Sequence, residues 1–320
     1  MPEPRWGWLI VLYLFLGGLS AGLFFISALA TYLQRGDGTA FPRLARAGAL
    51  LAPWPVSLGS ALLVFDLGHW YRFYKLFVSF EWRSPMSIGA WLLLLFTGIT
   101  LLSFWAWLPA DRLGAALARL PRRLRFLRGL ERPWREGLRR PLAMVGFPVA
   151  VGVGIYTGVL LGAVQARPFW NTNLVAQMFL FSALSTGCAL LILVLSLRRS
   201  GLEADEARLL FSLDIVLIVL ELFVVLPYII HGALSPLAVQ EALRLILGGP
   251  FTWAFWGWFF TLGLLLPLGL ELWEMRPVLL ARQELHPGRG MAPVAAVLVL
   301  FGGLMLRYVF VFAGQVSTFR

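Results

Sequence analysis

Ionisable side chains interrupt several apolar stretches of this chain, and each is a candidate for proton chemistry. The segment FDLGHWYRF places Asp66, His69 and Arg72 three residues apart. In a continuing helix these side chains lie on roughly one face. A carboxylate beside a histidine suits proton exchange, and an arginine can hold the carboxylate ionised or bond a carbonyl oxygen. The alternative is a polar cap at a helix end, where charge costs little.

A second set lies along one later apolar stretch. Asp214, Glu221 and Tyr228 are each seven residues apart, so they share a helix face. A charged side chain facing lipid costs about 2.5–3.5 kcal/mol at the bilayer centre. We therefore expect this face to point into the protein, where it serves either as a proton path or as structural ion pairs with Arg307. Arg307, inside the last apolar stretch, needs such an anion or a carbonyl partner.

Tyr156 is the third candidate, in the segment YTGVLLGAVQARPFWN. A phenol in apolar surroundings needs a hydrogen-bond partner, and a quinone carbonyl is a suitable one. The alternative is an ordinary interfacial tyrosine of an aromatic belt.

Membrane helices must position these groups, because the chain has too few polar residues for a water-exposed surface. Of its 320 residues, 59% are hydrophobic and 13% charged, against about 45–50% and about 25% in soluble domains. Crossing the hydrocarbon layer takes about 20 apolar residues. We predict an all-α integral membrane protein with eight transmembrane helices. They are expected near residues 7–33, 48–67, 87–108, 142–164, 173–197, 209–230, 252–274 and 293–313.

The cationic residues predict the orientation. Nineteen of the 27 Lys and Arg residues fall in the loops 34–47, 109–140, 198–208 and 276–292, and only seven fall on the opposite side. The positive-inside rule puts the arginine-rich loops in the cytoplasm. Both termini are then extracytoplasmic, in a multi-pass protein of the cytoplasmic (inner) membrane. The same bias accounts for the net charge of +11, so lipid rather than nucleic acid is the expected surroundings.

A faint internal repeat divides the chain. Leu14–Gly22 reads LFLGGLSAG, and Phe179–Gly187, 165 residues later, reads FLFSALSTG. At the same offset Asp66 falls on His231. This pattern predicts two four-helix bundles in parallel orientation. The two halves are residues 1–164 and 165–320.

Few residues are available to hold a metal. The single cysteine, Cys188, excludes an intrachain disulfide and a cysteine-held iron–sulfur cluster. Haem b in a helical bundle usually takes two histidines on facing helices, whereas His69 and His231 are both predicted at the outer boundary. We expect no haem, iron–sulfur cluster or other metal in this chain, and any redox metal to belong to a partner.

Five segments together resemble the NrfD family, the membrane subunits of polysulfide reductase and nitrite reductase systems. They are WGWLIVLYLFLGGLSAG, DLGHWYRF, SPMSIGAWLL, YTGVLLGAVQARPFWN and LRYVFVFAGQ. The resemblance implies an eight-helix subunit, without a cofactor of its own, that anchors an iron–sulfur electron-transfer subunit. That partner often connects to a molybdopterin enzyme or a multihaem cytochrome. Quinol is then bound near the membrane face that meets the iron–sulfur subunit.

The resemblance also bears on individual residues. Tyr156 matches the family's tyrosine in the segment preceding its RPxWN motif. Tyr13 falls where the polysulfide-reductase branch has a histidine, and Ile10 where that branch has an asparagine. These departures are compatible with a different quinone or with recruitment of Asp66 and His69.

From these observations we predict a quinone head-group pocket at the outer ends of the helices. Tyr156, Asp66 and His69 are the expected catalytic residues. The quinone-binding set is Tyr13, Asp66, His69, Arg72, Tyr156 and His231, and the proton path is Asp214, Glu221, Tyr228 and Arg307. The aromatic and basic loops 70–86 and 165–172 are the candidate docking surface for the partner.

The predicted function is electron exchange between membrane quinone and the iron–sulfur partner, with proton transfer as a further possibility. Two other functions fit the same residues. A secondary transporter also uses repeats and buried carboxylates, and a passive anchor would only hold a partner at the membrane.

Overall fold

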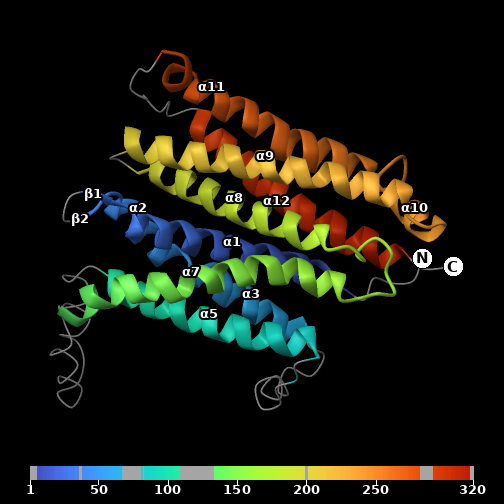
Figure 1. Cartoon of the computed structure of the whole chain (residues 1–320), viewed down its shortest axis with the longest axis horizontal. Helices are drawn as coiled ribbons and strands as arrows, with labels where there is room; N and C mark the ends of the chain where they lie inside the picture. Colours follow the sequence, from blue (N-terminus) through green and yellow to red (C-terminus); the bar gives the residue numbers. More distant parts are fainter. Residues whose placement is uncertain are drawn as a thin grey trace.

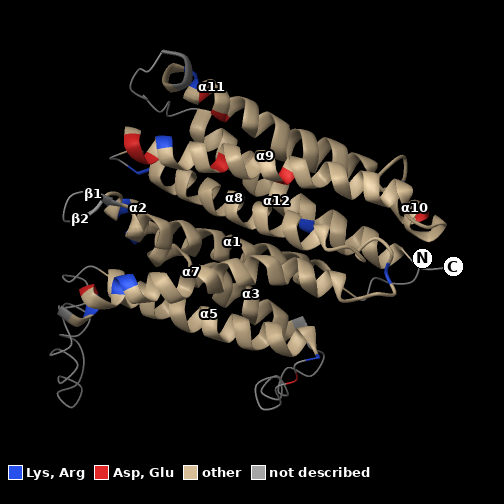
Figure 2. Ribbon diagram, viewed as in Figure 1, with Lys and Arg blue, Asp and Glu red and all other residues tan. Residues whose placement is uncertain are grey.

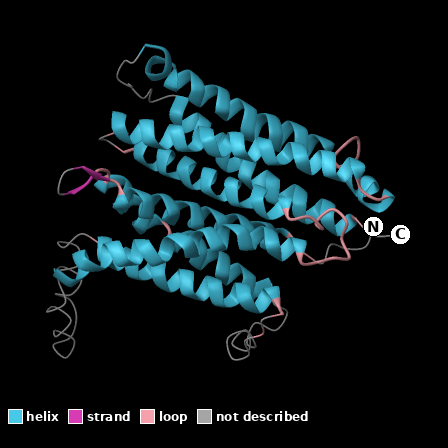
Figure 3. Cartoon of the chain, viewed as in Figure 1, coloured by secondary structure: helices cyan, strands magenta, loops and turns pink. Residues whose placement is uncertain are grey.

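The computed structural model describes residues 6–35, 38–66, 81, 83–108, 133–198, 201–281 and 291–317, and this part of the chain is almost entirely helical (Figure 3). Within these residues, 8 helical stretches are long and apolar enough to cross a membrane. The predicted number of spans is thus confirmed, and the chain is a multi-pass membrane protein. The Asp66 backbone is described, but its side chain, His69 and Arg72 lie outside the described part.

The spans follow one another along the chain, each as one helix or as two consecutive helices (Figure 1). They are α1 (Trp8–Tyr32), α2 with α3 (Pro42–Leu51 and Pro53–Asp66), α5 (Pro85–Trp107), α7 (Pro133–Gly162), α8 (Leu174–Ser196), α9 (Ala204–Leu234), the π-helix η3 with α11 (Trp253–Leu265 and Leu266–Ala281), and α12 (Met291–Val316). A short helix, α10 (Leu237–Arg244), follows α9. A two-residue hairpin, β1 (Gln34–Arg35) and β2 (Gly38–Thr39), follows α1.

The second span begins earlier than predicted and is broken in its middle. Pro53 and Pro55 have no backbone N–H, so each removes one helical hydrogen bond, and α2 ends two residues before α3 begins. The hydroxyl of Ser20 on α1 donates to the carbonyl of Ala52 in the break, at 2.5 Å. The break is therefore supported by the neighbouring helix.

The seventh span starts as a π-helix, which the sequence pattern did not predict. A 13-residue π-helix is unusually long, because this form normally appears as a single turn. It packs against α12 at Gly263 and Gly302, where a Cβ on either glycine would collide with the other. The wider backbone changes which face the following residues present, so helical spacing counted from Trp253 misplaces the side chains of α11.

Two helices occupy the middle of the bundle. α1 packs against α3, α7, α8 and α12, and α8 packs against α1, α7, α9 and α12. α3 and α5 lie on one side of this central pair, and α9 and α11 on the other (Figure 1). α1 begins and α12 ends at the same end of the molecule, which we call the outer end, and the opposite end the inner end.

Arginines at the inner end hold helix ends together. Arg135 on α7 donates to the Trp105 carbonyl at 2.9 Å, and Arg139 donates to the Ala106 carbonyl at 3.1 Å, so both satisfy the end of α5. Arg43 on α2 pairs with Glu206 at the start of α9. Figure 2 shows charged residues gathered at this end. Some of the arginines that were counted as a topology signal therefore also stabilise the fold.

Candidate functional site

Two phenols meet near the outer end of the bundle. Tyr13 comes from the second turn of α1 and is 1% exposed, and Tyr156 comes from the outer part of α7 and is 7% exposed. The ring of Tyr156 lies over Gly89 of α5, where a Cβ would overlap it. The glycine of the SPMSIGAWLL segment therefore makes room for this ring.

The Tyr13 hydroxyl is unusual because it is buried and has unused hydrogen-bonding capacity within the described residues. The two phenols interact across the interface between α1 and α7. Among the described residues, however, no group has the geometry of a hydrogen bond to the Tyr13 hydroxyl. Leaving a buried hydroxyl unpaired costs about 1–3 kcal/mol. The pair can therefore donate to an acceptor that enters from outside the described chain, such as a carbonyl oxygen.

The end of α3 lies on the outer side of these two tyrosines. A Cβ on Gly59 of α3 would lie 3.4 Å from the carbonyl oxygen of Tyr13. Asp66 follows seven residues later as the last described residue of α3, about 10 Å further toward the outer end. That Asp66, His69 and Arg72 join the tyrosines stays a prediction, because these side chains lie outside the described residues.

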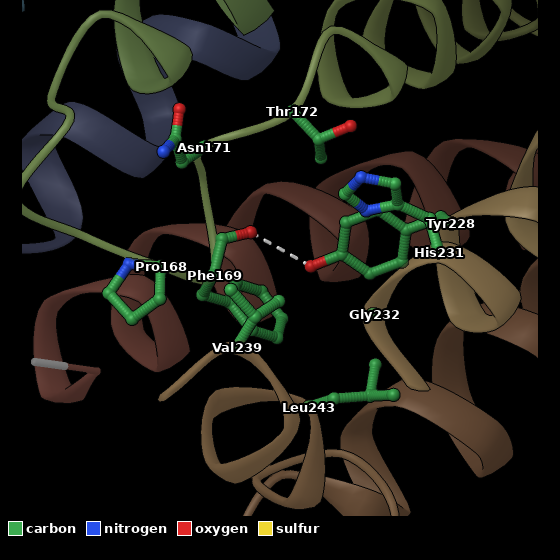
Figure 4. A pocket seen from close by; sticks show the side chains of 9 residues that line it. All are labelled: Pro168, Phe169, Asn171, Thr172, Tyr228, His231, Gly232, Val239 and Leu243. Carbon is green, nitrogen blue, oxygen red and sulfur yellow. Dashed lines mark hydrogen bonds between the residues drawn. The ribbon is translucent and has the colours of Figure 1, made fainter. Parts of the chain in front are cut away.

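His231 does not share a pocket with the two tyrosines. It lines a depression between α9, α10 and the segment after α7 (Figure 4), which the Tyr228 hydroxyl closes by donating to the Phe169 carbonyl at 2.9 Å. The lining residues are Pro168, Phe169, Asn171, Thr172, Tyr228, His231, Gly232, Val239 and Leu243. The room inside it for the centres of water-sized spheres is about 10 Å³, which holds about one water molecule. It suits water better than a quinone.

A second polar centre lies deep in the bundle. Asp214 and Glu221 on α9, Glu271 on α11 and Arg307 on α12 are each at most 1% exposed. Figure 2 shows charged residues in the middle of several helices as well as at the helix ends. Tyr228, on the same face of α9, is 4% exposed. The predicted inward orientation of this face is confirmed, while its role as a proton path stays a prediction.

Arg307 is held by three groups and faces a carboxylate. Its guanidinium donates to the Ser182 hydroxyl, to the Gly303 carbonyl at 3.0 Å and to the Phe179 carbonyl at 3.2 Å. Glu221 interacts with both Arg307 and Ser182. Of the two partners predicted for Arg307, the structure supports Glu221. Arg307 is therefore the buried cation that interacts with Glu221, although the two side chains form no ion pair among the described residues.

Asp214 has a different partner, which the sequence analysis missed. One of its oxygens accepts from the Ser185 hydroxyl at 2.5 Å, and the side chain also interacts with Glu271. Glu271 lies in the segment GLELWEMR, inside the predicted seventh span. Glu221 was singled out because it lies within an apolar stretch, and the same criterion would have identified Glu271.

The comparison with known proteins identifies the family. The sequence profile described as "Polysulphide reductase, NrfD" matches residues 2–318. The chain belongs to the NrfD polysulphide reductase family. It is 32% identical to Protein NrfD of Escherichia coli (strain K12) over 320 residues, covering 98% of this chain and 95% of that protein. It is 30% identical to a polysulfide reductase chain of Wolinella succinogenes, covering 97% and 94%.

A more distant relative is a selenate reductase subunit of Mesobacillus selenatarsenatis. It is 26% identical over 276 residues, which cover 78% of this chain and 62% of that protein. In this NrfD-family chain, no three His, Cys, Asp or Glu side chains of the described residues gather to hold a metal ion.

The RPFWN segment of the NrfD-family chain fastens the outer end. Trp170 is buried under Gly314, donates to the Phe310 carbonyl at 2.6 Å and stacks on Trp6 at 5.2 Å between ring centroids. Arg167 donates to the Gln315 carbonyl at 2.5 Å. The segment thus ties the loop after α7 to the start of α1 and the end of α12.

This arrangement corrects one prediction. The loop 165–172 was expected to offer its aromatic residues to a partner, but Phe169 and Trp170 are each only 2% exposed. Buried rings cannot be interface contacts. Most of the other predicted docking loop, 70–86, lies outside the described residues.

Proposed function

We propose that this chain is the quinone-reactive membrane subunit of a respiratory oxidoreductase in the cytoplasmic membrane. It would exchange electrons between the quinone pool and an iron–sulfur partner subunit. The observation that carries the proposal is the buried hydroxyl of Tyr13 beside Tyr156, which has no hydrogen-bond partner within the described part of the chain. Two relatives are named as parts of reductases, one of polysulfide reductase and the other of selenate reductase, which supports the reaction class.

The chemistry required of the protein itself is modest. Tyr13 and Tyr156 donate hydrogen bonds to the oxygens of the head group and hold it in place. Oxidising a quinol releases two electrons and two protons. Asp66 and His69 are the proposed proton acceptors, and the electrons leave for the iron–sulfur cluster of the partner.

The partner is expected at the outer end, because the phenol pair lies near it. With both termini extracytoplasmic, this end faces away from the cytoplasm. The iron–sulfur subunit would link the protein to a molybdopterin or multihaem catalytic subunit, which sets the terminal substrate.

The buried charges are the proposed proton path. Arg307 approaches α1 at Gly18, where a Cβ would lie 3.2 Å from its guanidinium. Tyr13 is five residues away, about 8 Å along α1. Arg307 and Glu221 thus lie at a depth in the bundle close to that of the two phenols. Arg307 contacts a different face of α1. Glu221→Gln is expected to slow proton-coupled turnover while quinone binding survives, and unchanged turnover would remove Glu221 from the path.

Quinone-analogue binding to the purified protein, followed by tryptophan fluorescence quenching, tests the site. The wild type is compared with Tyr13→Phe and Tyr156→Phe. Tyr32→Phe is the matched control, because Tyr32 sits at the inner end of α1 and donates to the Arg140 carbonyl. Saturable binding weakened only by the first two substitutions supports the proposal.

The alternative functions give other results. Binding that none of the three substitutions weakens would remove the phenol pair from the site and favour a passive anchor. Substrate uptake by vesicles containing this protein alone would favour a secondary transporter.

A further inference from the structure

We propose that Asp214 and Glu271 together hold one exchangeable proton in the inner half of the bundle, as the entry site of the proton path. The inference deepens the proposed function and rests on it for its role in turnover. The proton-holding pair itself is tested separately below.

The unsatisfied atoms of the pair point to the missing proton. Asp214 and Glu271 face each other from α9 and α11 and are 0% and 1% exposed. Ser185 occupies one Asp214 oxygen. The other Asp214 oxygen and both Glu271 oxygens have no donor among the described residues. Two ionised carboxylates offer only acceptors, so a proton on one of them supplies the donor that the contact requires.

Electrostatics leads to the same result. Two negative charges in contact, out of water, repel strongly and each loses its hydration. In the described part of the chain, no Lys or Arg forms an ion pair with either carboxylate. Arg307, the buried cation nearby, interacts with Glu221. A bound proton lowers the charge of the pair from two to one without requiring another side chain.

The groups around the pair do not suit a metal ion. From α8, the Ser185 hydroxyl and the buried Cys188 thiol face the two carboxylates, and Glu221 adds its charge from one side. Hard cations take at least six oxygen ligands, and the described residues here supply two carboxylates and one hydroxyl. The proton is the cation that fits this donor set.

The position of the pair makes it the entry of the path. Asp214 lies ten residues after the start of α9, and Glu271 ten residues before the end of α11. Both are thus about 15 Å from the inner end of the bundle. Glu221 and Arg307 lie closer to the phenols. A proton that arrives from the inner side therefore reaches this pair before it reaches Glu221 and Arg307. Its transfer moves a proton only and no electrons.

Infrared difference spectroscopy of the full-length protein in lipid vesicles tests the shared proton. At neutral pH, exchange of H2O for D2O should shift a carboxylic-acid C=O band. That band should lose intensity in Asp214→Asn/Glu271→Gln and keep it in Glu241→Gln, a control on the exposed face of α10. A double variant with an unchanged band would overturn the proposal. So would loss of the wild-type band on adding sodium ions at fixed pH, because a metal ion would then be the ligand.

The role in turnover is measured on the oxidoreductase isolated with its partners and placed in vesicles. Protons moved per quinol oxidised should fall in Glu271→Gln, and an unchanged ratio would take the pair off the path. Failure of the proposed function would look different. There, Tyr13→Phe and Tyr156→Phe would leave quinone-analogue binding intact, whatever the infrared band shows.

Discussion

Gly22 of α1 and Gly187 of α8 pack directly against each other, and they are equivalent positions of the sequence repeat. A Cβ on Gly187 would overlap the backbone of Gly22, and a Cβ on Gly22 would lie 3.0 Å from the Gly187 Cα and overlap the Ala183 carbonyl. Gly18 and Ala183, also 165 residues apart, meet in the same way, with 3.2 Å between the Ala183 Cβ and a Cβ built on Gly18. Contact between equivalent residues is expected where a two-fold axis relates two halves. It supports the division into residues 1–164 and 165–320 as a proposal.

Gly22→Ala is expected to destabilise the protein by about 1–3 kcal/mol, because the new methyl group meets backbone that cannot move aside. Gly187→Ala should behave alike. Thermal unfolding in detergent measures the effect. Gly98→Ala is the matched control on α5, where a Cβ meets nothing within 4 Å. If Gly22→Ala lost no more stability than Gly98→Ala, the close contact between α1 and α8 at this glycine would not contribute to stability.

The helices were largely predictable, because length and apolar content decide whether a segment spans a membrane. Their interruptions were not. The break at Pro53 depends on support from Ser20, a residue of another helix. The π-helix at Trp253–Leu265 has an ordinary apolar sequence, and its packing of Gly263 on Gly302 is a tertiary contact. The sequence of each segment alone therefore predicts neither the supported break nor the π-helix.

The sequence predicted many residues of the candidate site, but it did not predict which of them lie together. Spacing alone placed Asp214, Glu221 and Tyr228 on one buried face. It could not show that Tyr13 meets Tyr156 while His231 lines a separate depression, since all three share the same depth. Trp170 is the opposite case, because its ring looked available to a partner until the fold buried it under Gly314.

Removing the hydroxyls of the phenol pair should slow quinol oxidation by the assembled complex. A hydrogen bond contributes about 0.5–1.5 kcal/mol, which corresponds to a factor of about 2–10 in kcat/KM for Tyr13→Phe or Tyr156→Phe. Steady-state kinetics with a soluble quinol measures it. Tyr32→Phe should keep the wild-type rate. Wild-type rates in both pocket variants would show that the head group binds elsewhere.

Trp170→Phe should loosen the outer end. The change removes the hydrogen bond from Trp170 to the Phe310 carbonyl, a loss of about 0.5–1.5 kcal/mol, and weakens the stack on Trp6. Limited proteolysis should then cleave near the N-terminus faster than in the wild type. Trp253→Phe is the control, since Trp253 is 81% exposed. Equal cleavage rates in all three proteins would argue that Trp170 does not fasten this end.

Arg307→Met should cost about 1–3 kcal/mol, because it removes the buried cation that interacts with Glu221 and a side chain that donates hydrogen bonds. The size of the loss does not by itself identify the cause, since Arg307 also donates to the Ser182 hydroxyl and to the Phe179 carbonyl. A double-mutant cycle separates the two contributions. If charge balance dominates, Glu221→Gln added to Arg307→Met should recover part of the lost stability in thermal unfolding. If the two losses simply add, the arginine acts mainly as a strut between α12 and α8, and the partner of Glu221 has to be sought among other groups.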